Sequence, residues 1–111
     1  MKAILLSVLL LTGVSLQATA ASFDCNKAKA ADEKTICANR DLNDKDVQLA
    51  TKYTFLKGLF AMGARGEMQD GQRAWLKSRQ QCGKDKACLT KRYDERLQQL
   101  DDIYSRINKP L

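Results

Sequence analysis

This chain of 111 residues contains four cysteines, and their spacing limits the folds that are open to it. Eleven residues separate Cys25 from Cys37 and five separate Cys82 from Cys88, so there is no CxxC pair of the kind that typical zinc sites use. Two disulfides are expected instead, because a small domain in an oxidising compartment gains much of its stability from such bridges. Three pairings are possible. We favour Cys25 with Cys37 and Cys82 with Cys88, since each pair flanks a predicted turn, and we expect no bound metal and no cofactor.

The first 20 residues have the pattern of a secretory signal peptide. Lys2 precedes the apolar run from Ala3 to Leu11, and Ala18-Thr19-Ala20 offers the small residues at which signal peptidase cleaves. The run is too short, and too often interrupted by polar residues, for a transmembrane helix. We therefore expect residues 21–111 to form one small domain that is periplasmic or secreted and has no membrane anchor.

The chain contains no histidine. This removes the commonest general base, the usual partner of a serine or cysteine nucleophile, and the commonest metal ligand. Two carboxylates could still act as acid and base, but that chemistry needs a walled cleft, which about 90 residues rarely provide. The composition therefore favours a binding protein and not an enzyme.

Apolar residues recur with helical spacing along the mature chain, and no stretch alternates as a strand would. Asp32 is expected to cap a short helix that runs through Cys37, and Asp41 is expected to open a second helix. The apolar stripe of that second helix comprises Leu42, Leu49, Tyr53, Leu56 and Phe60. The pattern predicts an all-α fold, a small antiparallel bundle of about four helices.

Four glycines, at positions 58, 63, 66 and 71, interrupt the helical pattern in the middle of the chain. Because an interior glycine weakens a helix by about 1 kcal/mol, they predict a break near Gly63 to Gly66. A third helix then runs from about Glu67 to Cys82-Gly83, where glycine suits a left-handed closing residue. Asp85 is expected to cap a fourth helix, which continues until Pro110.

Several single residues are candidates for either the core or a binding surface. Trp75 shares a helical face with Met68 and Leu76, which favours a core position over a binding hot spot. For Arg79 we favour an internal pair with a carboxylate of a neighbouring helix over contact with a partner. Leu59 and Met62 lie off the main apolar stripe and are the better candidates for exposure.

Positive charge is concentrated between Arg73 and Arg96. The chain carries net charge +6, or +5 once Lys2 is removed with the signal peptide, and these 24 residues alone carry +5. A solvated helical face is the ordinary explanation. However, the expected turn at Cys82 to Cys88 folds the stretch back on itself, which concentrates a positive potential at one end of the bundle and would attract an acidic partner. The candidate partner-binding residues are Arg73, Lys77, Lys84, Lys86, Lys91 and Arg92.

The ordered features of the mature chain resemble a known family. They are Phe23-Asp24-Cys25, the segment Glu33 to Cys37, the segment Gln72-Arg73-Ala74-Trp75-Leu76-Lys77-Ser78-Arg79, Cys82, Cys88-Leu89 and Tyr93 to Arg96. Over residues 22–107 they are similar to the N-terminal domain family of the LprI-type lysozyme inhibitor. The resemblance implies an exported helical domain that inhibits lysozyme. The inhibitor that gave the family its name looks like a lipoprotein, whereas Ser22-Phe23-Asp24 ahead of Cys25 does not fit a lipid-attachment site.

Three kinds of partner fit a basic exported domain. One is a lysozyme or another muramidase, whose acidic cleft the basic turn would enter. Another is anionic cell-envelope material, such as peptidoglycan stem carboxylates or surface polysaccharide. The third is a secreted bacterial toxin that the chain would neutralise as an immunity protein. Nucleic acid is a poor partner, because an exported chain seldom meets it and base-stacking aromatic residues are few. The sequence does not indicate the oligomeric state.

Overall fold

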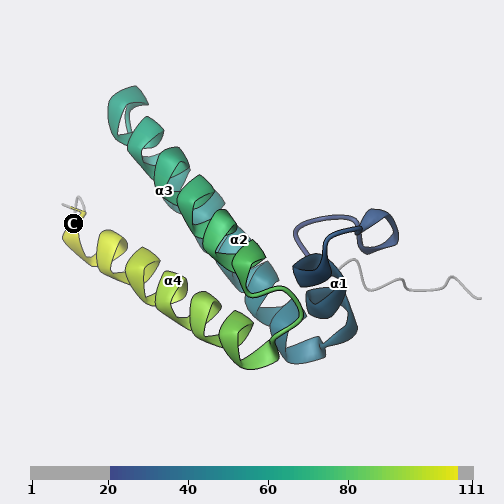
Figure 1. Cartoon of the computed structure of the whole chain (residues 1–111). Coiled ribbons are helices and arrows are strands. Elements are labelled where there is room, and N and C mark those ends of the chain that lie inside the picture. The colour runs from purple at the N-terminus through teal and green to yellow at the C-terminus, as the bar shows by residue number, and fades with distance from the viewer. Residues whose placement is uncertain (1–20, 108–111) are drawn as a thin grey trace, which may run out of the picture.

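A computed structural model describes residues 21–107, which fold into four α-helices and one turn of 3-10 helix (Figure 1). The described part contains no strand, so the all-α prediction is confirmed. The predicted signal peptide, residues 1–20, and Pro110 lie outside the described residues. The elements are η1 (Cys25–Lys27), α1 (Ala31–Ala38), α2 (Arg40–Leu59), α3 (Met62–Gln81) and α4 (Lys86–Arg106).

The three long helices lie side by side, with α3 antiparallel to both α2 and α4. Two ion pairs show the parallel course of α2 and α4, because Lys45 pairs with Asp94 and Lys52 pairs with Asp101, and both pairs are 49 residues apart. The short helix α1 packs against α2 and α3 near the start of α2 (Figure 1). We call this region, which also contains the α3–α4 turn and both disulfides, the disulfide end. The opposite region, around the Phe60–Ala61 turn between α2 and α3, is the hairpin end.

Leucines at seven-residue steps on α2 form one side of the core. Leu42, Leu49 and Leu56 are each buried, as the predicted stripe requires, and they face α4. The single tryptophan, Trp75, lies in the core, which confirms that prediction; its ring meets Tyr93 edge-on at 5.0 Å, and its Nε1 donates to the Arg92 carbonyl at 2.9 Å. The buried residues of α4 are Leu89, Tyr93, Arg96, Leu97 and Leu100.

Two helix starts differ from the prediction that aspartate caps them. Asp32 is the second residue of α1 and is buried, and Ala30 occupies the N-cap position without a side-chain hydrogen bond. Asp41 is likewise the second residue of α2, whose N-cap is Asn39. At α4 the prediction is confirmed, because the Asp85 carboxylate accepts from the Cys88 amide at 3.2 Å.

The break between α2 and α3 lies at Phe60–Ala61, and the prediction of a break near Gly63 to Gly66 is wrong. Helix α3 begins at Met62, five residues before the expected start at Glu67, so Gly63 lies in its first turn and Gly66 and Gly71 lie in its interior. The helix forms in spite of these glycines because Phe60 and Met68 pack on the core and hold the ends of this segment. The Arg65 side chain also donates to the Phe60 carbonyl at 3.2 Å, across the turn.

Both disulfides have the predicted pairing. The Cys25–Cys37 bridge ties η1 to the last turn of α1, and the Cys82–Cys88 bridge closes the turn between α3 and α4. Gly83 in that turn has φ +56°, a left-handed conformation that favours glycine because it lacks Cβ. Among the described helices, none is long and apolar enough to cross a membrane.

Candidate functional site

A buried polar network at the disulfide end joins all four helices. The Arg79 Nε donates to the Asp32 carboxylate at 2.8 Å, which links α3 to α1. The Arg79 Nη1 lies 3.5 Å from the Tyr93 hydroxyl and 3.7 Å from the Asp46 carboxylate, and the Tyr93 hydroxyl donates to that carboxylate at 2.7 Å. Phe23 and Trp75 cover the guanidinium at 5.5 and 5.8 Å. The predicted internal pair of Arg79 is confirmed.

The surroundings of Tyr93 and Arg79 in this network keep the phenol protonated and the guanidinium charged. Burial, followed by the neighbouring Asp46 carboxylate, raises the pKa of Tyr93 far above its ordinary value, so its hydroxyl stays protonated as a donor. Burial by itself would lower the pKa of Arg79, but Tyr93 and Asp32 outweigh it and the pKa is raised. The network therefore binds the protein's own helices together, and the Arg79 charge is not offered to a partner.

Arg96 is a second basic residue turned inward. Its guanidinium donates to Gln72 and Gln99, at 3.1 Å in both cases, and burial lowers its pKa while Tyr53 acts in the opposite direction. Gln72, Trp75 and Arg79 thus all make contacts between helices. The segment from Gln72 to Arg79 that carried the family resemblance serves chiefly to build the fold.

Three of the six candidate partner-binding residues pair with carboxylates on their own helix. Arg73 lies 3.3 Å from Asp70, while Arg92 and Lys91 approach Glu95 at 3.1 and 4.0 Å. These pairs are solvent-exposed or half-buried, so they contribute little to stability, but they reduce the local positive potential. Arg73 also lies more than two turns, about 12 Å, before the end of α3, so it is set apart from the turn.

The other three candidates, Lys77, Lys84 and Lys86, are exposed and have no ion pair within residues 21–107. Lys84 and Lys86 lie in the α3–α4 turn and at the first residue of α4, and Lys77 lies one turn before the end of α3. Asp85 stands between the two lysines, but its carboxylate is directed to the Cys88 amide as the helix cap. Between Arg73 and Arg96, these three lysines are therefore the exposed basic side chains whose charge no ion pair within the described residues reduces.

Sequence reasoning missed Arg40, which joins Lys86 at the disulfide end. The first residues of α2 and the start of α4 line a hollow of about 200 Å³, bordered by Asn39, Arg40, Asp41, Leu42, Lys86 and Thr90. No signal in the sequence pairs position 40 with position 86, because only the packing of α2 against α4 brings them to one surface. We call Arg40, Lys77, Lys84 and Lys86 the basic surface.

A comparison with protein families identifies this arrangement. The family model described as "Lysozyme inhibitor LprI" matches residues 25–100. This chain belongs to the LprI family. The match includes all four cysteines, the buried network of Arg79 and the whole basic surface, and it confirms the resemblance. No curated protein and no solved structure gives a significant match.

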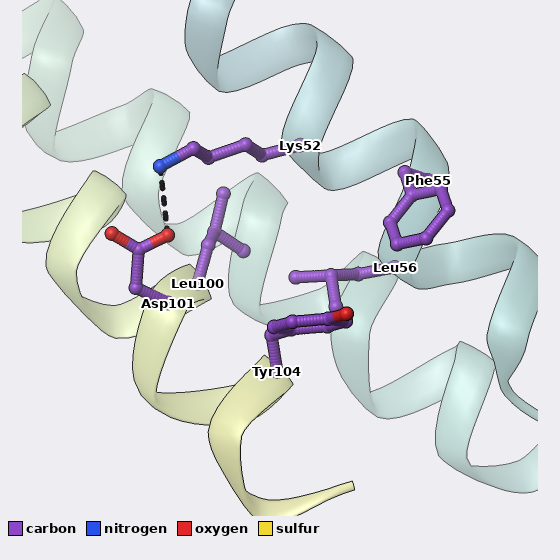
Figure 2. A pocket seen from close by; sticks show the side chains of 6 residues that line it. All are labelled: Lys52, Phe55, Leu56, Leu100, Asp101 and Tyr104. Atoms are coloured by element: carbon purple, nitrogen blue, oxygen red, sulfur yellow. Dashed lines mark hydrogen bonds and ion pairs between the residues drawn. The ribbon is translucent and has the colours of Figure 1, made fainter. Parts of the chain in front are cut away.

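The LprI domain also has an apolar recess, which lies between α2 and α4 near the hairpin end (Figure 2). The recess measures about 260 Å³, and Figure 2 shows the Lys52–Asp101 pair along one side and the Phe55 and Tyr104 rings toward the other. Leu59 and Met62 are 49% and 88% exposed nearby, which confirms their predicted exposure. In the described part of the chain, no group of three or more His, Cys, Asp or Glu residues is placed to hold a metal ion.

Proposed function

We propose that this protein is an exported, non-enzymatic inhibitor of a lysozyme or a related peptidoglycan hydrolase, and that the basic surface blocks the acidic cleft of its target. Membership of the LprI family supports an inhibitor role. Two disulfides suit a protein that works in an oxidising compartment, periplasmic or secreted. The observation that carries the choice of surface is a pair of exposed lysines, Lys84 and Lys86, at a turn closed by a disulfide, with Lys77 one helical turn before it; none of the three has an ion pair within residues 21–107.

The mechanism follows from the chemistry of the target cleft. Glycoside hydrolysis by these enzymes uses two carboxyl groups, one of which protonates the leaving oxygen. A lysine ammonium placed beside them would stabilise both as carboxylates and would exclude the sugar chain. Common animal lysozymes are basic overall, so long-range steering opposes the complex, and affinity must come from local contacts inside the cleft.

The test is lysis of a peptidoglycan substrate by animal, goose-type and phage-type enzymes, with and without an equimolar amount of the mature, oxidised protein. We expect inhibition of at least one class. The Lys84→Glu/Lys86→Glu variant should lose at least about tenfold in inhibitory potency, because each reversal replaces attraction to the cleft carboxylates by repulsion. Arg65→Glu/Arg106→Glu, with the same change of net charge at exposed positions toward the hairpin end, should inhibit like the wild type. Absence of inhibition in all three classes would refute the proposal.

The same unpaired lysines favour a second candidate, a module that binds anionic cell-wall polymer. Binding of this kind would sediment the protein with purified cell wall, would weaken as salt is added, and would require no enzyme. The Lys84→Glu/Lys86→Glu/Lys91→Glu variant should then remain in the supernatant. If the wild type inhibits an enzyme in solution but does not sediment with cell wall, the inhibitor function is the one to retain.

A further inference from the structure

The outward face of α2 is uncharged for more than three turns. Its exposed residues are Val47, Gln48, Thr51, Thr54, Phe55, Gly58 and Leu59. The two lysines of this part of α2 are directed away from the face. Lys52 pairs with Asp101 on α4, and the Lys57 ammonium lies 5.5 Å from the centre of the Tyr53 ring. Charged residues make up 29% of this chain, and a solvent-facing helix surface normally carries them. The exposed large apolar side chains on this face, Val47, Phe55 and Leu59, are of the kind that mark an interaction surface.

This face combines an exposed aromatic ring with a hollow. The Phe55 side chain is 58% exposed, although the centroid of its ring lies 6.2 Å from that of Tyr104 on α4. Beside it, a shallow apolar hollow is lined by Ala50, Thr51, Thr54 and Phe55 itself. The face therefore offers a large aromatic group and, within one helical turn, a space bordered by small side chains that could receive such a group.

We propose that this face binds a second copy of the chain through antiparallel packing of α2 against α2, with the two-fold axis near position 53. The order of side chains along the face is what selects this occupant. With the axis at 53, Phe55 of each copy lies opposite the small Thr51 of the other, and Val47 lies opposite Leu59. One surface patch thus complements itself, as a two-fold contact requires.

Charge favours the same arrangement. The protein is strongly basic, so two copies associate only where their contact surfaces are uncharged and their basic surfaces are far apart. Helix α2 begins at the disulfide end with Arg40, which borders the same hollow as Lys86. Antiparallel pairing therefore places the two basic surfaces at opposite ends of the dimer, whereas parallel pairing would bring them together. The dimer would present two outward binding surfaces.

The contact is small. Val47 to Leu59 spans about 18 Å of one helix, so the contact belongs with small, transient interfaces and the dimer should dissociate readily. The test is sedimentation velocity of the mature, oxidised protein from about 1 to about 200 µM. We expect a shift from monomer to dimer over this range, and added salt should not weaken it because the contact is uncharged. A wild type that stays monomeric throughout would overturn the proposal.

Charge variants near the axis locate the contact. Thr54 is exposed beside the axis, so Thr54→Glu and Thr54→Lys should each shift the midpoint of dimer formation at least about tenfold upward by repulsion across the axis. The control, Gln80→Glu at an exposed position of α3, should dimerise like the wild type. A mixture of Thr54→Glu with Thr54→Lys should recover dimers, since the two charges are then opposite. Failure of the mixture to recover them, with both variants as helical as the wild type by circular dichroism, would overturn the antiparallel arrangement.

Discussion

The two ends of this bundle are stabilised by different means. The disulfide end has both bridges and a buried network in which Arg79, Asp32, Asp46 and Tyr93 each come from a different helix. The hairpin end has Leu56 and Phe60 on the core, exposed apolar side chains and glycines that face open space. The strongest constraints therefore lie at the same end of the bundle as the basic surface. A rigid support of this kind lets lysines meet a target without the chain first having to order itself.

Among changes that test how the disulfide end is stabilised, Arg79→Leu should have the largest effect. The change leaves Asp32 and Asp46 buried without their cation and should lower the free energy of unfolding by about 3 to 5 kcal/mol. Urea unfolding followed by circular dichroism measures it. Arg73→Leu, six residues earlier on the same helix and exposed, should have little effect. Equal effects of the two changes would show that the network does not stabilise the disulfide end.

Removing one bridge at a time should have the next largest effect. In the chain-entropy description, Cys25→Ala/Cys37→Ala should cost about 3 kcal/mol and Cys82→Ala/Cys88→Ala slightly less, because the second loop is shorter. Thermal unfolding of each double variant measures the loss. If both double variants retained the stability of the wild type, the bridges would not be what stabilises the disulfide end more than the hairpin end.

Tyr93→Phe gives the disulfide end a characteristic pH dependence. At neutral pH the loss of the hydroxyl should cost about 1 to 3 kcal/mol, because the Asp46 carboxylate loses a buried donor. The folded state raises the pKa of Tyr93 above its ordinary value of 10.0, so only the unfolded state ionises this residue just above pH 10. Its contribution is therefore complete below pH 10 and is lost as the pH rises further, by about 1.4 kcal/mol per pH unit. Denaturant unfolding at several pH values from about 8 to about 11.5 gives the free energy of unfolding of both proteins. The difference between the two values should shrink as the pH rises above 10, and a difference that stays constant would contradict this role of Tyr93.

The smallest effect should come from glycine replacement, and it should differ in sign between the two ends. At the hairpin end, Gly63→Ala and Gly66→Ala should each stabilise the protein by about 0.5 to 1 kcal/mol, because both positions are helical and an added methyl group meets open space. At the disulfide end, Gly83→Ala should destabilise it by about 1 kcal/mol, because φ is +56° there. Thermal unfolding of the three variants checks both signs. If Gly63→Ala destabilised the protein, position 63 would not be helical, and the break between α2 and α3 would lie at the glycines and not at Phe60–Ala61.

Features that depend on neighbours in the sequence could be predicted, and features that depend on distant residues could not. The Asp85 cap, the core position of Trp75 and the disulfide pairing all follow from local spacing or helical phase. Local preference favours Asp32 as a helix cap, but its partner in the folded chain, Arg79, lies 47 residues further along the sequence. The helix-weakening effect of the glycines is also local, whereas the packing of Phe60 and Met68 that offsets it exists only in the folded chain.

The candidate site was predictable in part for the same reason. The excess of basic residues between Arg73 and Arg96 is visible in the sequence, and so are the same-helix pairs at three- and four-residue spacing that reduce it. The inward turn of Arg79 and Arg96, and the arrival of Arg40 beside Lys86, depend on how the helices pack.

The connectivity of the disulfides also bears on how the protein matures. Each bridge joins cysteines 12 or 6 residues apart, so neither requires distant parts of the chain to have met. Closing a loop of this length takes far less time than thiol oxidation, and each correct partner is also the nearest thiol along the chain. Oxidation can therefore proceed before the helices assemble, with little need for an isomerase to correct wrong pairings.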